Sequence, residues 1–191
     1  MKPPPIEELR NILPYTRLAE MNICVSHVYR KHIIHEITQS RGDLLEKIRA
    51  RISRGEPGME RWPGYLERTR EYAGDSRYPL CQRLVVILGD RLLVSKTHGK
   101  ELLNGAFVVV QKLDDTGITV RDCETGAETT VPHDRFQEHF LSARAICYAT
   151  CQAKTIEGTI ALHQTGHPHF TRRCLLVGLS RGRAKHLVTV K

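Results

Sequence analysis

Three cations near the C-terminus, Arg181, Arg183 and Lys185, lie between the apolar runs "CLLVGLS" and "HLVTV". Arginine is always charged, and its planar fork of donors suits a phosphoryl group better than lysine does. An arginine held by a rigid element can stabilise the charge that develops on a phosphoryl group during its transfer. The same residue can instead cap a helix C-terminus, where the helix dipole favours a cation. The residues alone leave both interpretations open.

The distribution of charge also indicates an anionic partner. The chain has a net charge of +8, and residues 158–191 contain six Lys/Arg and no Asp or Glu. Residues 41–77, by contrast, hold nine Lys/Arg against seven acids, which is typical of a solvated helical surface. A segment of one sign is typical of proteins that bind a nucleic-acid backbone or a nucleotide phosphate, although many basic tails have no such role.

Other kinds of chemistry find little support. Cys147 and Cys151, with the histidines at 163, 167 and 169, match no common zinc spacing, so no metal site is predicted. No Ser lies in a nucleophile elbow, and the segment "THGKEL" lacks both the first glycine and the hydroxyl residue of a P-loop. The chain is therefore not expected to hold a nucleoside triphosphate with a P-loop of its own.

The six cysteines lie mostly among Val, Leu and Ile, which indicates reduced thiols in a core. We therefore expect an intracellular protein of the cytoplasm, the nucleus or a viral factory. No apolar run approaches the roughly 18 residues of a membrane span, and the first residues do not resemble a signal peptide.

Periodicity and turn residues predict an α/β framework with a β-rich insertion. A strand at "MNICVSH" precedes two helices, one ending before Gly42 and one over 43–54, then a loop over 55–64 and a helix over 65–72. Glycine turns then separate short strands, which is typical of a small antiparallel barrel. The last part predicts strands at "ARAICYAT", "GTIALH" and "HLVTV", with a helix at "PHFTRRCLLVGLSR". The expected parts are residues 1–81, 82–135 (the insertion) and 136–191.

Four segments in order resemble one family: "NICVSHVYRKHI", "GDRLLVSKTHGKELLNGAFVVV", "ICYATCQAKTIEGTIALH" and "CLLVGLSRGRAKHLVTV". They resemble the C-terminal half of superfamily 1 DNA helicases, most closely the RecD-like branch common in viruses and mobile elements. The likeness runs from about Met21 to the end. It implies a RecA-like second motor domain that lacks the P-loop and carries a small antiparallel β-barrel insertion.

The resemblance also implies roles for individual residues. Arg181 matches the arginine finger that reaches ATP at the domain interface, and Arg30 falls where the family has a basic residue near the nucleotide. In the family motif "YA.T.H..QG.T", Thr150 matches the threonine, Gln152 replaces the histidine, and the Gln-Gly pair is absent. The implied contacts with single-stranded DNA are Thr150, Gln152, Lys154 and Lys96.

The implied activity is that of an ATP-driven helicase in DNA replication, of viral type. ATP and Mg²⁺ are expected only when a P-loop domain or subunit completes the site, because the first motor domain is not part of this sequence. A second hypothesis is a non-catalytic, helicase-derived adaptor that binds nucleic acid or protein. A third, a basic RNA-binding β-barrel protein, explains the charge but not the order of the segments.

Overall fold

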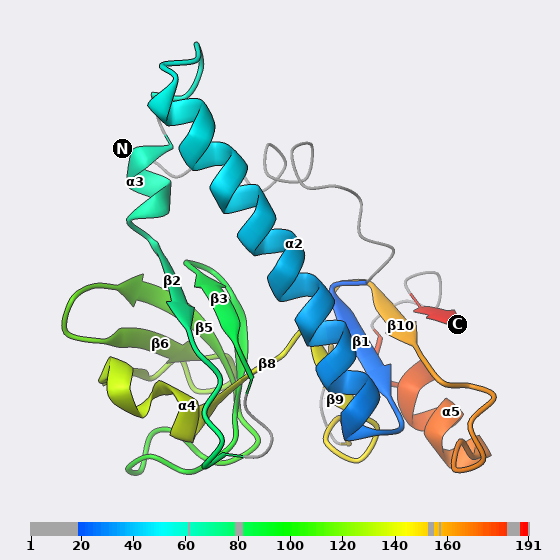
Figure 1. Ribbon diagram of the computed structural model, residues 1–191. Helices are drawn as coiled ribbons and strands as arrows, with labels where there is room; N and C mark the ends of the chain where they lie inside the picture. The colour runs from blue at the N-terminus through cyan, green and yellow to red at the C-terminus, as the bar shows by residue number, and fades with distance from the viewer. Residues whose placement is uncertain are drawn as a thin grey trace. The chain divides into compact units, whose positions relative to one another are not determined.

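A computed structural model describes residues 19–60, 62–78, 82–152, 155–156, 158–182 and 188–190. They fall into two compact units. Unit 1 takes its described residues from 36–141, and unit 2 takes them from 19–35 and 142–190. Helix α2 (His27–Ser53) begins in unit 2 and continues into unit 1 (Figure 1). Among the described residues, no helix has both the length and the apolar character that a membrane span requires.

Unit 2 is built on a parallel sheet. In the described part of the chain its strand order is β11 (Val188–Val190), β10 (Ile160–Leu162), β1 (Met21–Cys24) and β9 (Ala145–Cys147), and all the pairings are parallel. Every residue of β1, β9 and β10 is buried, as expected of strands covered on both faces. These strands, together with α5 (Arg172–Leu179), confirm the predicted α/β framework.

A buried polar pair joins the two central strands of this sheet. Asn22 of β1 is fully buried, and its amide nitrogen donates to the carbonyls of Ala19 (3.0 Å) and Arg144 (2.9 Å). Its oxygen lies 2.8 Å from Nε2 of His163, which follows β10. Because an amide oxygen only accepts, the Nε2–H of His163 is the donor. With these partners the asparagine is satisfied inside an otherwise apolar sheet.

Helix α2 runs through Gly42 without a break, so the prediction of two helices separated there is wrong. A glycine inside a helix costs about 1 kcal/mol relative to alanine. Packing beyond the glycine offsets this cost, because the next turns bury apolar side chains against a loop and a strand of unit 1. That cluster comprises Leu45, Ile48, Met59, Trp62 and Val85.

The predicted helix over 65–72 is also wrong. Helix α3 covers only Pro63–Leu66, and β2 (Thr69–Tyr72) pairs antiparallel with β3 (Leu84–Ile87). Thr69 faces Ile87, and Tyr72 faces Leu84. The β-branched and aromatic ends of β2 suit this pairing, and the tertiary contact outweighs the local helical pattern.

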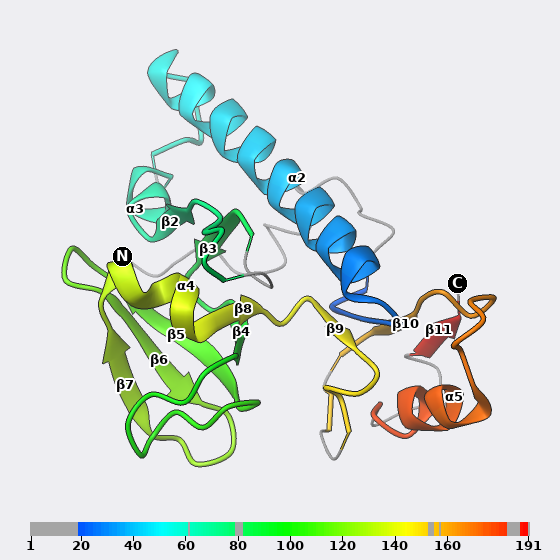
Figure 2. The same cartoon turned by 60° about the horizontal axis from the view of Figure 1, so that its bottom comes forward.

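The β-rich segment forms a second sheet in unit 1 (Figure 2). Its order among the described residues is β7 (Glu128–Val131), β6 (Ile118–Asp122), β5 (Phe107–Leu113), β4 (Arg91–Val94) and β8 (Phe140–Ser142). The pairs β4–β5, β5–β6 and β6–β7 are antiparallel, as predicted. Closure of this sheet into a barrel stays a prediction.

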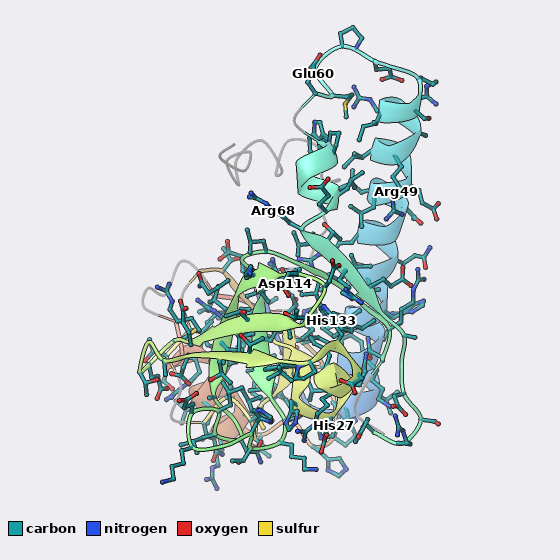
Figure 3. The ribbon with its side chains drawn as sticks, turned by 90° about the vertical axis from the view of Figure 1, so that its left-hand side faces the viewer. His27, Arg49, Glu60, Arg68, Asp114 and His133 are labelled. Carbon is teal, nitrogen blue, oxygen red and sulfur yellow. The ribbon has the colours of Figure 1, made fainter. Side chains whose placement is uncertain are left out.

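Two short helices, a 3-10 helix over His133–Arg135 and α4 over Phe136–His139, connect β7 to β8. Figure 3 shows His133 beside Asp114, whose carbonyl accepts from Nε2 of His133 at 2.6 Å. Nδ1 of His133 lies 2.7 Å from the hydroxyl of Tyr72, whose ring stacks on Phe136 at 3.6 Å between centroids. Burial raises the pKa of Tyr72 to about 12, so its hydroxyl keeps its proton. These contacts hold β2 against the helical connection.

Candidate functional site

The candidate site lies at the carboxyl edge of the parallel sheet in unit 2. Ligands of open α/β sheets bind outside this edge, where the connections leave neighbouring strands in opposite directions. Strands β1 and β10 are such neighbours, because the chain goes from β1 toward β9 and from β10 toward β11. The residues that follow these strands therefore form the candidate site.

The side chain of Gln164 hydrogen-bonds to the backbone just before α2. Oε1 of Gln164 accepts from the backbone N–H groups of Val25 and Ser26, both at 3.0 Å. The hydroxyl of Ser26 accepts in turn from the N–H of Tyr29 at 3.2 Å and so caps the helix. Gln164 has a φ of 59°, a left-handed conformation that a non-glycine residue rarely adopts, and these hydrogen bonds hold it there. The end of β10 is thus joined to the end of β1.

Arg30 lies one turn into α2 and is buried, with 3% of its surface exposed. Its backbone N–H donates to the carbonyl of Ser26 at 3.1 Å. Its charge acts on two thiols, those of Cys24 at the end of β1 and Cys147 at the end of β9. Contact with Cys24 and, after it, the charge of Arg30 lower the pKa of Cys147. Contact with Cys147 and burial raise the pKa of Cys24, and Arg30 offsets this only in part. The structure therefore places the predicted nucleotide-binding arginine inside unit 2, beside a pair of cysteines.

Arg181 follows the end of α5. The helix begins with Thr171, whose hydroxyl accepts from the N–H of Cys174, and ends at Leu179. Nε of Arg181 donates to the carbonyl of Val177 at 3.2 Å, and Nη2 donates to the hydroxyl of Ser180 at 2.8 Å. The guanidinium thus caps the last turn of α5, as one of the two interpretations of the sequence expects.

The backbone of Arg181 joins α5 to the segment that follows β9. Its carbonyl accepts from the N–H of Ile156 at 2.8 Å, and Gly182 forms a parallel bridge with Ile156. The charge of Arg181 also acts on Cys151, although burial dominates and raises the pKa of that thiol to about 11. Arg181 and the turn after β9 are therefore neighbours within unit 2.

The predicted DNA-binding residues separate into two groups. Thr150 and Gln152 lie in the turn after β9, where the N–H groups of Thr150 and Cys151 donate to the carbonyl of Cys147 at 2.9 and 3.2 Å. Thr150 is half-buried, and Gln152 is exposed. Lys96 belongs to unit 1, where it forms an ion pair with Glu138. Lys154 lies outside the described residues, as do Arg183 and Lys185.

No group of three or more His, Cys, Asp or Glu side chains suited to a metal ion occurs in the part of the chain that the structure describes. Cys147 contacts a different histidine from those considered in the sequence, since its sulfur lies 3.4 Å from Nδ1 of His27. Figure 3 shows His27 at the start of α2. The pairing of Cys24, Cys147 and His27 and the role of Gln164 were missed in the sequence, because each joins segments more than 100 residues apart.

No protein-family model and no curated protein matches the chain. Solved structures do match its fold. A crystal structure of Bacteroides Pif1 bound to single-stranded DNA has a TM-score of 0.56 at 19% identity, over 97% of this chain and 45% of that chain. A structure that addresses unwinding of forked double-stranded DNA by two coordinating Pif1 helicases has a TM-score of 0.55 at 20% identity, over 96% and 41%. Pif1 helicase from Candida albicans has a TM-score of 0.52 at 10% identity, over 96% and 48%.

The chain thus has a fold similar to part of these Pif1 helicases, and it spans less than half of their length. At the level of the fold, this confirms the predicted likeness to helicases. The neighbours are Pif1 helicases, and the narrower RecD-like branch stays a prediction.

Proposed function

We propose that this chain is the second, C-terminal motor domain of an ATP-driven superfamily 1 DNA helicase whose P-loop half is supplied by another segment or subunit. The observation that carries the proposal is the position of Arg181, directly after α5 and beside the turn that follows β9. A rigid helix and a backbone bridge hold this arginine next to the segment assigned to DNA. The arrangement suits a residue that couples a nucleotide to a strand.

Arg181 is proposed as the arginine finger. Two of its hydrogen bonds go to a carbonyl and a hydroxyl, both neutral acceptors. A phosphoryl group is a stronger, charged acceptor, so a nucleotide presented by a partner can draw the guanidinium away from the helix. Such a finger raises the rate of phosphoryl transfer by about 10³–10⁵-fold.

ATP and Mg²⁺ would be held chiefly by the partner. This chain offers guanidinium groups, which fit phosphate oxygens, but the described residues provide no cluster of carboxylates that fits Mg²⁺. Arg30, which lies one turn into α2, is proposed as a second contact with the nucleotide. The metal would neutralise charge on the phosphates, while Arg181 would stabilise the group being transferred.

Exposed leucines on α5 support the need for a partner. Leu176 is 67% exposed and Leu179 is 42% exposed, and residues three apart lie on one face of a helix. The same helix positions Arg181. A P-loop domain that receives the finger would therefore also cover these leucines.

The turn after β9 is proposed to contact single-stranded DNA through Thr150, Gln152 and Lys154. In the resemblance, Thr150 matches the threonine of the DNA-contacting motif and Gln152 replaces its histidine. The side chain of Gln152 is exposed, so it is accessible to a strand.

Fluorescence anisotropy with a labelled oligo-dT strand tests the DNA contact. We expect binding that weakens with salt, because cations of the protein displace counterions from the strand. The variant Lys154→Ala should reduce the slope of log K against log[salt] by about 0.7. Lys112→Ala removes the same charge from unit 1, where Lys112 pairs with Asp114, and should leave the slope unchanged. Absence of binding at low salt, or equal effects of the two variants, would contradict the proposal.

One alternative has structural support. The burial of Arg30 and the capping role of Arg181 also suit a helicase-derived adaptor in which both arginines stabilise the fold. The adaptor binds nucleic acid or protein but does not stimulate hydrolysis. Loss of ATPase activity in Arg181→Ala, with partner binding unchanged, would favour the helicase.

A further inference from the structure

Two cysteines face each other across neighbouring strands of unit 2. Cys24, the last residue of β1, is paired in register with Cys147, the last residue of β9. Neighbouring strands lie about 4.8 Å apart, which is within the Cα separation of about 4.4–6.8 Å that a disulfide spans. Residues opposite each other on paired strands point to the same face of the sheet. The two thiols are close enough to act on each other's pKa, and the Cys24 thiol donates a hydrogen bond to the carbonyl of Ile146 at 3.4 Å.

The surroundings make the two sulfurs unequal. Contact with the Cys24 thiol lowers the pKa of Cys147, and the charge of Arg30 lowers it further. Nδ1 of His27 lies 3.4 Å from the sulfur of Cys147. Contact with Cys147, together with burial, raises the pKa of Cys24, so that this sulfur keeps its proton. One residue thus has the character of an attacking thiolate and the other that of a resolving thiol.

We propose that Cys24 and Cys147 form an oxidation site that closes into an intramolecular disulfide in response to a peroxide. The Cys147 thiolate attacks one peroxide oxygen, the O–O bond breaks, and a sulfenic acid and water are formed. The Cys24 sulfur then attacks the sulfenic sulfur, an S–S bond forms, and a second water leaves with the protons. In sum, two thiols and one hydrogen peroxide give one disulfide and two waters.

Cys147 is 6% exposed, and Cys24 beside it is fully buried, so the oxidant must be as small as hydrogen peroxide. The cross-link would fix the end of β1 to the end of β9, immediately before the turn that carries Thr150. This inference does not depend on the helicase proposal, since it rests only on the strand register and the neighbours of the two sulfurs.

The direct experiment is a peptide map of the full chain after treatment with hydrogen peroxide and alkylation in denaturant. We expect a peptide containing Cys24 joined to Cys147 and reversed by dithiothreitol. The chain has six cysteines, so this leaves four for alkylation. The cross-link closes a long loop, so the oxidised chain should also melt at a higher temperature than the reduced one.

Variants separate the roles of the two sulfurs. In Cys24→Ser the sulfenic acid at Cys147 persists and is trapped by a 1,3-diketone, whereas Cys147→Ser gives neither adduct nor cross-link. His27→Ala removes the imidazole that lies 3.4 Å from the sulfur of Cys147 and should slow formation of the adduct several-fold. Cys123 is exposed and serves as the control, since Cys123→Ser should leave the Cys24–Cys147 peptide unchanged.

The peptide map of the wild-type chain tests the Cys24–Cys147 disulfide even where a variant fails to fold. A disulfide between Cys147 and Cys151, or a Cys24–Cys147 pair that stays reduced while Cys123 is oxidised, would overturn the proposal.

Discussion

The ion pair between Arg41 and Asp90 joins α2 to the turn between β3 and β4 within unit 1, and its removal gives the sharpest prediction for stability. Nη1 and Nη2 of Arg41 donate to the two carboxylate oxygens of Asp90 at 2.6 and 2.8 Å. Nη1 also donates to the carbonyl of Val85 at 2.9 Å. The side chains are 16% and 10% exposed, so solvent screens the pair only weakly.

Arg41→Met keeps most of the stem of the side chain but removes all three of these hydrogen bonds. In this variant the carboxylate of Asp90 still accepts a hydrogen bond from the backbone N–H of Ile87, at 3.0 Å. Breaking one side of a buried ion pair costs about 3–5 kcal/mol. We expect about 3 kcal/mol here, because both side chains retain some exposure. Asp90→Asn keeps a hydrogen-bond acceptor and should cost about 1–2 kcal/mol.

Urea unfolding followed by Trp62 fluorescence measures this loss. Trp62 is the single tryptophan and is buried in the α2 cluster of unit 1, so its signal reports that unit. With a slope of about 2 kcal/mol per M, a loss of 3 kcal/mol lowers the midpoint by about 1.5 M. The matched control is Arg54→Met. Arg54 is 62% exposed and pairs with Glu56, so its loss should cost less than about 0.5 kcal/mol.

A double-mutant cycle completes the experiment. The coupling energy between Arg41 and Asp90 should be about 2 kcal/mol. The reasoning is refuted if Arg41→Met destabilises unit 1 no more than Arg54→Met does, or if the cycle shows no coupling.

Two further predictions concern α5 and the Lys96 ion pair. In Gly178→Ala the new Cβ would lie 2.6 Å from Cδ2 of the buried Leu162, so either the Leu162 side chain or α5 must shift. Urea unfolding followed by circular dichroism should show a loss of about 1–3 kcal/mol, and a gain would contradict the close packing. Lys96, with a smaller effect of Arg135, lowers the pKa of Glu138 from 4.5 to about 2. This pair therefore contributes stability that is present above about pH 4.5 and is lost as the pH falls toward 2. In Lys96→Met a carboxyl NMR titration should show the pKa of Glu138 rising toward 4.5, and an unchanged value would contradict the assignment.

Sequence patterns were sufficient where an element is set by local chemistry. Strands β1 and β10 are short apolar runs of strand length, and the segment "PHFTRRCLLVGLSR" indicates α5. The antiparallel strands between residues 84 and 131 follow from their turn residues, such as Gly89 with a φ of 85°. These signals lie within a few residues of one another.

Elements that depend on distant partners were not predicted. Gly42 favours a helix end, but its helix continues because Leu45 and Ile48 pack against Trp62. The stretch ending at Tyr72 has a helical pattern, but it becomes a strand because β3 pairs with it. In both cases the decisive interaction is a tertiary one that a local pattern does not contain.

For the candidate site, the sequence indicated individual residues but not their neighbours in space. The order of the segments indicates Arg30 and Arg181, but the sequence does not show that Arg30 is buried beside Cys24 and Cys147. That arrangement requires the register between β1 and β9, which are separated by more than 100 residues. The contact of Gln164 with the start of α2 depends on the order of the strands in the same way.

The most direct test of the proposed function is ATP hydrolysis in the presence of single-stranded DNA, with this chain and a P-loop protein that copurifies with it. The comparison is between wild type, Arg181→Ala and the matched control Arg172→Ala, which removes an exposed arginine from the other end of α5. We predict that the complex hydrolyses ATP, that Arg172→Ala preserves this activity, and that Arg181→Ala lowers it by about 10³-fold or more. Hydrolysis that is equally fast with Arg181→Ala would contradict the central claim.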